Sequence, residues 1–159
     1  MGSLWSCGCA RFLCGIYQLM YEYACTVDRV VDGDTVDVVL DLGFDVRFFS
    51  RVRLYGIDTP ESRTRDKDEK ARGLISKKFL QDSLADQEVV IKTKLKDSRG
   101  KYGRVLGELW VDGVNINQTM VDKNLAVDYQ GQSKDAVKEA HLVNREALIA
   151  EGIFDPDNF

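Results

Sequence analysis

Two runs of β-branched and apolar residues, 24–31 and 35–42, stand on either side of the short segment Asp32-Gly33-Asp34. Val, Ile and Thr favour extended strands, and Asp-Gly between two such runs is typical of a tight hairpin turn. The pattern therefore predicts an antiparallel β-hairpin near the start of the regular part of the chain.

The following residues continue the sheet and add helices. Strands are predicted at 46–57, 88–96 and 104–111, and helices at 67–84, 115–123 and 133–150. Ser133 is a suitable N-cap for the last helix. The apolar face of that helix is predicted to consist of Ala136, Ala140, Val143, Ala147 and Ala150. Five strands with a helix between the third and fourth predict an α+β fold that is mainly β, a five-stranded OB-fold barrel with two further C-terminal helices.

Length and composition fit one globular domain, expected at about residues 20–155. The formal net charge of the 159 residues is -4, but the segment from Arg63 to Arg104 holds 13 Lys and Arg against 7 Asp and Glu. Such a segment is either a solvated surface or a surface that meets a polyanion.

Most cysteines fall in the first 14 residues, and His141 has no Cys or His partner at ligand spacing. Neither a disulfide framework nor a zinc site is therefore predicted.

Residues 1–19 form a leader with several interpretations. It contains no acidic residue, and its apolar run is too short to span a bilayer. A signal peptide, a lipidated N-terminus (Gly2 and Ser6 match the myristoylation pattern) and a plain extension of the domain all remain open. The compartment is therefore unknown: intracellular if the functional chain starts near Met20, and secreted or membrane-associated in the other two cases.

The segment "RLYGIDTPES", residues 53–62, changes abruptly from apolar to charged. An arginine inside an apolar strand is costly unless it meets a carboxylate or a phosphate. Asp34 follows the hairpin turn and Asp58 ends the third strand, so both are expected at one rim of the barrel. Two carboxylates at a rim suit a hard divalent cation, although each also suits the turn beside it.

The spacing within this segment predicts a local distortion. Arg53 and Asp58 are five residues apart, so in a straight strand their side chains would point to opposite faces. A bend or bulge near Gly56 would bring them together, because glycine tolerates the backbone angles of a bulge. The step Thr59-Pro60 then favours an extended turn that returns Glu61 to the rim.

Three ordered motifs resemble the staphylococcal nuclease-like (thermonuclease) family: "DGDTV" at 32–36, "RLYGIDTPE" at 53–61 and "KYGR" at 101–104. The resemblance covers about residues 25–129. It implies an OB-fold nuclease that depends on Ca²⁺ and cleaves DNA and RNA to leave 3′-phosphates. The substrate is expected to be single-stranded or locally opened, and the protein a monomer without an obligate protein partner.

The resemblance also assigns roles to residues. It makes Asp34, Asp58 and the Thr59 carbonyl the metal ligands. It makes Glu61 the general base or water-orienting group. Binding of the scissile phosphate is carried over to Arg53 and Arg104, and the surroundings of the nucleotide to Lys101, Tyr102 and Tyr129.

The chemistry of phosphodiester hydrolysis is consistent with these residue types. Negative charge gathers on the nonbridging oxygens, and a cation with two arginines stabilises it.

The main alternative to a nuclease is a noncatalytic nucleic-acid-binding module on the same fold. A nucleotide- or oligosaccharide-binding OB domain is a third alternative, and the basic segment fits it poorly.

Overall fold

The computed structural model of the protein describes residues 21–93 and 104–158. The leader and two of the predicted substrate-binding residues, Lys101 and Tyr102, lie outside the described residues. Of the helices in the described part of the chain, none has the length and apolar character needed to cross a membrane.

The described residues form eight strands, three α-helices and one short 3₁₀-helix. The strands are β1 (Tyr21–Asp32), β2 (Thr35–Asp41), β3 (Arg47–Leu54), β4 (Ile57–Asp58), β5 (Val89–Thr93), β6 (Val105–Val111), β7 (Val114–Asn115) and β8 (Val127–Asp128). The helices are α1 (Lys67–Leu84), α2 (Ile116–Asp122) and α3 (Lys134–Ala150), followed by the 3₁₀-helix Pro156–Asn158.

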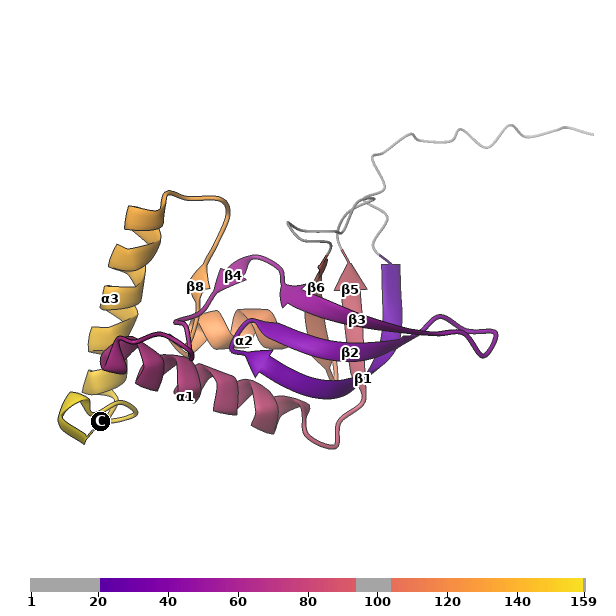
Figure 1. Ribbon diagram of the computed structural model, residues 1–159, viewed down its shortest axis with the longest axis horizontal. Coiled ribbons are helices and arrows are strands. Elements are labelled where there is room, and N and C mark those ends of the chain that lie inside the picture. Colours follow the sequence, from indigo (N-terminus) through magenta and orange to yellow (C-terminus); the bar gives the residue numbers. More distant parts are fainter. Residues whose placement is uncertain (1–20, 94–103, 159) are drawn as a thin grey trace, which may run out of the picture.

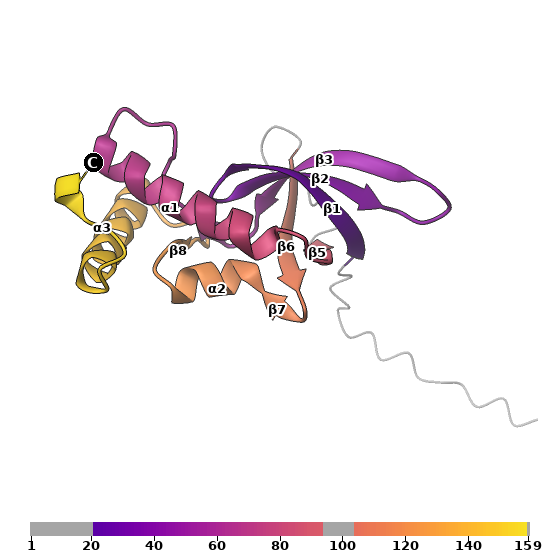
Figure 2. The ribbon, with the colours of Figure 1, turned by 90° about the horizontal axis from the view of Figure 1, so that it is seen from below.

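Five strands close into a barrel. Their hydrogen-bonded order is β3-β2-β1-β5-β6, and the parallel pairing of β3 with β6 joins the two ends of the sheet. The long β2–β3 hairpin projects at one end of the molecule, whereas the helices gather toward the other end (Figures 1 and 2). The structure confirms the predicted OB-type barrel with its helix between the third and fourth barrel strands.

The inside of the barrel is the hydrophobic core. Buried aliphatic side chains of the barrel strands meet there, among them Val36, Val52, Ile91 and Leu109. Leu80 of α1 and Met120 of α2 pack against the same core. Because such a core is closely packed, the polar residues beside it at the rim of the barrel are held on a rigid frame.

The sequence predictions and the structure agree closely at the hairpin and at the first helix, whose bounds are 67–84 in both. The predicted strand 46–57 is instead two strands, because a turn at Tyr55 and Gly56 separates β3 from β4. The two-residue strands β7 and β8 were not predicted, since so short a pairing leaves no periodic signal in the sequence.

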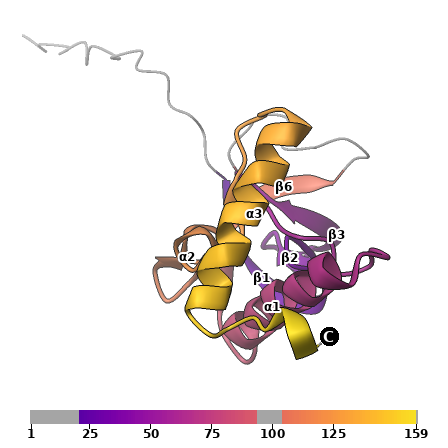
Figure 3. The ribbon, with the colours of Figure 1, turned by 90° about the vertical axis from the view of Figure 1, so that its left-hand side faces the viewer.

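Helix α3 has the predicted bounds, and the Ser133 side chain accepts a hydrogen bond from the Ala136 amide as predicted for its N-cap. The predicted apolar face is wrong. Val143 is 69% exposed, and the one buried residue of the helix is Leu148. Helix α3 lies across the end of the molecule (Figure 3), and it docks there largely through polar side chains, so an apolar stripe did not identify the contact face.

A buried carboxylate on β2 ties three strands together. Asp37 accepts hydrogen bonds from Arg51 on β3, at 2.6 and 2.9 Å, and from Arg29 on β1, at 2.8 Å. The hydrogen bonds from Arg51 are the largest influence on the carboxyl group. Burial opposes them, Arg29 adds to them, and together they lower the pKa of Asp37 to about 2.

We expect Asp37→Asn to lower the free energy of unfolding by about 2 kcal/mol at neutral pH, because charge-assisted hydrogen bonds are lost. The pKa of Asp37 is lower in the folded state than the unfolded value of about 3.9. The stabilisation of the folded state by ionised Asp37 is therefore complete above about pH 3.9 and is lost as the pH falls toward about 2. Urea unfolding measures this, with the exposed Asp45→Asn as control. A wild-type advantage that grows below pH 4 would contradict the ion-pair explanation.

Candidate active site

Arg53 of β3 lies between two carboxylates. Its Nη1 atom is 2.6 Å from Asp34 Oδ2, and its Nη2 atom is 2.7 Å from Asp58 Oδ1. Asp34 comes from the β1–β2 turn and Asp58 from β4. The three charged groups that the sequence predicted at one rim of the barrel are therefore brought together by the fold.

A bend at Gly56 makes this meeting possible. Gly56 has a φ of +76°, in the left-handed region, and it separates β3 from β4. The bend is held by the Asn117 side chain, whose Nδ2 donates to the Tyr55 carbonyl at 2.9 Å. The Tyr129 amide donates to the Gly56 carbonyl at 2.8 Å. The distortion that the odd residue spacing required is confirmed.

Asp34 is a buried carboxylate, only 4% exposed. Its Oδ1 accepts a hydrogen bond from the Thr35 hydroxyl at 2.8 Å, and its Oδ2 lies 3.4 Å from the buried Thr59 amide. Burial raises the pKa of Asp34, Arg53 and Thr35 oppose this, and the nearby carboxylates Asp58 and Asp32 raise it further. The negative charge at this position is therefore only partly compensated by protein groups.

Asp58 has a second partner, which the sequence analysis missed. The His141 Nε2 atom on α3 lies 3.0 Å from Asp58 Oδ2. Burial alone would raise the pKa of Asp58, but His141 and Arg53 outweigh it, so this pKa is lowered. His141 was considered only as a zinc ligand, and nothing in the sequence places residue 141 beside residue 58.

Helix α3 is fixed in this position by charged contacts to α1. Asp68, in the first turn of α1, accepts hydrogen bonds from Arg72 at 2.9 Å and from Arg145 at 2.8 Å. Arg72 also donates to the His141 carbonyl at 3.3 Å. His141 and Arg145 are four residues apart, so they share one face of the helix. That polar spacing was the one sequence signal for the contact face.

A hollow of about 400 Å³ opens in front of Arg53. Its lining residues are Val31, Asp32, Asp34, Thr35, Arg51, Arg53, Glu61, Arg63 and Arg104. Glu61 therefore faces the same space as Arg53 and Arg104, the two arginines to which the family resemblance assigns the phosphate. Partial loss of water raises the pKa of Glu61, and repulsion from Asp32 and Asp34 adds to the effect. A raised pKa makes a carboxylate a stronger proton acceptor.

Tyr129 follows β8, which pairs with β4, so its backbone lies beside the Gly56 bend. Tyr129 is 41% exposed and is not among the described residues that line the hollow. The role that was assigned to it stays a prediction.

The oxygen atoms at this rim fit a hard divalent cation. Asp34, Asp58 and the Thr59 carbonyl would supply two carboxylates and one carbonyl, which are the ligand types that Ca²⁺ prefers. The partly compensated charge of Asp34 favours an additional cation there. In the part of the chain that the structure describes, three or more His, Cys, Asp or Glu side chains do not converge on one point, so backbone and water oxygens would have to complete the coordination shell.

Gly73 of α1 controls the position of the segment that carries Glu61. A Cβ atom at Gly73 would lie 2.6 Å from the Pro60 carbonyl oxygen and 2.7 Å from the Ser62 amide nitrogen. Such distances are far below van der Waals contact, so α1 and the segment 60–62 touch only because this residue has no side chain. The glycine is a packing requirement of the site, not a weak point of the helix.

Gly73→Ala should therefore lower by about 10²-fold any reaction in which Glu61 takes part, because a displacement of about 1 Å at a reacting group has that effect. In an ordinary helix the same change would stabilise by about 1 kcal/mol. Here we expect a lower melting temperature instead. Lys78→Ala, on the exposed side of α1, is the matched control. A Gly73→Ala variant with wild-type activity and raised stability would contradict this packing argument.

Fold and site together define a small β-barrel protein with an arginine–carboxylate centre at its rim. The model of the family described as staphylococcal nuclease homologue matches residues 51–149. The chain therefore belongs to the staphylococcal nuclease homologue family.

Several curated proteins are similar to this chain. An uncharacterized endonuclease of Escherichia coli is 34% identical over 112 residues, which are 70% of this chain and 64% of that protein. A thermonuclease of Staphylococcus intermedius is 33% identical over 100 residues, 63% of this chain and 56% of that protein. A micrococcal nuclease of Shigella flexneri is 32% identical over 130 residues, 76% and 67% of the two chains. The chain thus spans about two thirds or less of the length of these relatives.

Proposed function

We propose that the protein is a calcium-dependent nuclease that hydrolyses phosphodiester bonds of DNA and RNA and leaves 3′-phosphate ends. The observation that carries this proposal is the position of Arg53, held between Asp34 and Asp58 and facing the same hollow as Glu61 and Arg104. Family membership and the names of the relatives support the reaction class. The proposed substrate is single-stranded or locally opened, and the proposed active form is a monomer.

The arginines bind the scissile phosphate in this mechanism. A guanidinium has five N–H donors, and Arg53 contacts its two carboxylates through Nη1 and Nη2. The carboxylates fix the orientation of the guanidinium before substrate arrives, so little reorganisation is needed. Arg104, directly before β6, lines the same hollow and would contact the phosphate as well. Both stabilise the negative charge that grows on the nonbridging oxygens.

Asp34, Asp58 and the Thr59 carbonyl would hold the Ca²⁺. When bound there, the ion supplies additional positive charge for the phosphate oxygens in the transition state. His141 and Arg53 keep the pKa of Asp58 low, so this carboxyl group stays ionised and able to act as a ligand. The protein thereby combines cationic side chains with anionic ligands in one small space.

Glu61 acts on the attacking water. It orients the water in line with the leaving oxygen and accepts its proton as the new P–O bond forms. The bond to the 5′ oxygen of the next nucleotide breaks, and the phosphate stays on the 3′ oxygen. Solvent water protonates the departing 5′ oxygen, since an arginine with a pKa above about 12 is a poor acid.

Cleavage assays on single-stranded DNA and RNA test the proposal. We expect both polymers to be shortened in Ca²⁺, with phosphate on the 3′ ends, as read by mass spectrometry of the products. Binding without any cleavage in Ca²⁺ would favour the noncatalytic module. Products with 5′-phosphate ends would contradict the direction of attack.

A further inference from the structure

The outer face of β3 carries a row of three cationic residues and one aromatic residue. In β3 the residues Ser50, Val52 and Leu54 point into the core, so Arg47, Phe49, Arg51 and Arg53 point outward. We propose that this row binds one strand of the nucleic acid, which leaves the hollow at Arg53 and follows β3 toward the β2–β3 hairpin. This inference rests on the proposed function and extends the substrate site beyond the scissile phosphate.

The spacing of the row suits an extended strand. Residues two apart in a β-strand are separated by about 6.8 Å, which is comparable to one nucleotide of an extended single strand. The register is regular along the whole row, since Arg47, Phe49, Arg51 and Arg53 pair in turn with Asp41, Val39, Asp37 and Thr35 of β2. No bulge therefore interrupts the row, which begins at Arg53, the residue proposed to bind the scissile phosphate.

Arg51 is prepared to bind a phosphate. Its Nε and one Nη atom hold Asp37, which fixes the guanidinium plane, and the side chain is still 47% exposed. The other N–H donors of the Arg51 guanidinium point away from Asp37. Arg51 also lines the hollow together with Arg53, so the two cations are continuous with one another along the strand.

Phe49 offers a platform for a base. It is 60% exposed, on the same face as Arg51 and one step further along the row. An exposed aromatic ring between two arginines has a cost in water unless it is covered by a flat apolar group. Bases stack on such rings regardless of sequence, and arginines beside them bind the backbone, which is how proteins hold single strands.

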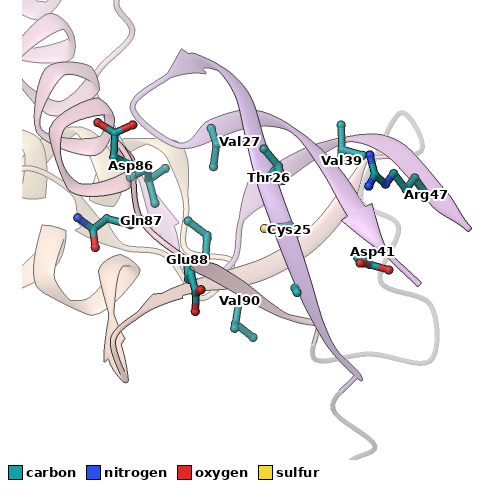
Figure 4. A pocket seen from close by; sticks show the side chains of 13 residues that line it. Cys25, Thr26, Val27, Val39, Asp41, Arg47, Asp86, Gln87, Glu88 and Val90 are labelled. Carbon is teal, nitrogen blue, oxygen red and sulfur yellow. The ribbon is translucent and has the colours of Figure 1, made fainter. Parts of the chain in front are cut away.

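A second, larger hollow of about 750 Å³ limits where the strand can go. It lies between β1, β2 and the segment that joins α1 to β5 (Figure 4), and it is bordered by Asp41, Asp86 and Glu88. Three carboxylates repel a polyanion. Arg47 lies at the border of this hollow, so the bound strand ends near Arg47 and does not enter it.

The test is binding of a fluorescent 12-nucleotide thymidine strand in the presence of chelator, so that no cleavage occurs. Phe49→Ala should weaken binding by about tenfold. Phe48→Ala is the matched control, since Phe48 is the neighbouring, 46% exposed phenylalanine on the opposite face of β3, and it should bind like wild type.

Arg51→Gln should weaken binding and reduce the slope of log affinity against log salt concentration by about 0.7, the value for one phosphate contact on a single strand. Arg29→Gln is its control, because it removes the other ion pair to the same carboxylate. In Ca²⁺, both row variants should lose more kcat/KM on the 12-nucleotide strand than on a dinucleotide.

Equal effects of Phe49→Ala and Phe48→Ala, or of Arg51→Gln and Arg29→Gln on the salt slope, would overturn the row as a binding surface. Failure of the proposed function has a different signature. A protein that cleaves nothing in Ca²⁺ but loses affinity in the row variants would refute the nuclease and leave the binding row intact.

Discussion

Arg53→Gln is expected to lower the rate of DNA cleavage by about 10³- to 10⁵-fold, the range for removal of an arginine that stabilises charge on a phosphoryl group in the transition state. The substitution also leaves Asp34 and Asp58 without the guanidinium that lies 2.6 and 2.7 Å from them. Since Asp34 is buried, we expect the free energy of unfolding to fall by about 3 kcal/mol in the absence of Ca²⁺.

Arg53→Lys separates the two effects. A lysine keeps the positive charge and should recover part of the stability, but a single ammonium group cannot bridge both carboxylates and a phosphate with a planar fork. The rate should therefore stay well below wild type, as measured by single-turnover cleavage at a temperature where both variants are folded. A lysine variant with the wild-type rate would show that a point charge is sufficient and would refute the bridging role of Arg53.

Glu61→Gln is expected to lower kcat by about 10²- to 10⁴-fold, because a glutamine can neither accept a proton nor orient water as a carboxylate does. KM and the melting temperature should change little, since Glu61 lies at the surface of the hollow. The pKa of Glu61 is raised by partial burial and by neighbouring carboxylates. The acid limb of the wild-type pH–rate profile should therefore lie above the pKa of an ordinary glutamate, and the Gln variant should lose that limb.

Glu88→Gln is the control for Glu61→Gln, because Glu88 borders the other hollow. It should keep the wild-type rate and the wild-type pH profile. Equal cleavage by Glu61→Gln and wild type would contradict the role of Glu61 as the base, whatever the behaviour of the other site variants.

The core of the site could be predicted from the sequence because it is local. The hairpin turn delivers Asp34, and a ten-residue segment delivers Arg53, Asp58 and Glu61. Within that segment, strand parity was enough to require the bend that Gly56 provides with its φ of +76°. Short-range geometry of this kind follows from alternation and glycine alone.

Contacts between distant segments could not be predicted in the same way. His141 and Asp58 are 83 residues apart, and α3 reaches this place through Asp68, Arg72 and Arg145. A contact made by polar side chains leaves no periodic apolar pattern in the sequence. The predicted contact face of α3 was therefore wrong at Val143. The close approach of Gly73 to the Glu61 segment was also not predictable, since a helical glycine does not by itself indicate what lies beside it.

The dependence of single-stranded DNA cleavage on free Ca²⁺, compared between wild type and Asp58→Asn, tests the central claim most directly. If Asp34, Arg53, Asp58 and Glu61 form a calcium-dependent phosphodiesterase site, wild type should be inactive in chelator and should reach a saturating rate as Ca²⁺ is added. The Asn variant should need at least about tenfold more Ca²⁺, because one carboxylate ligand is lost. Cleavage that persists in chelator, or the same Ca²⁺ midpoint in both proteins, would contradict the account.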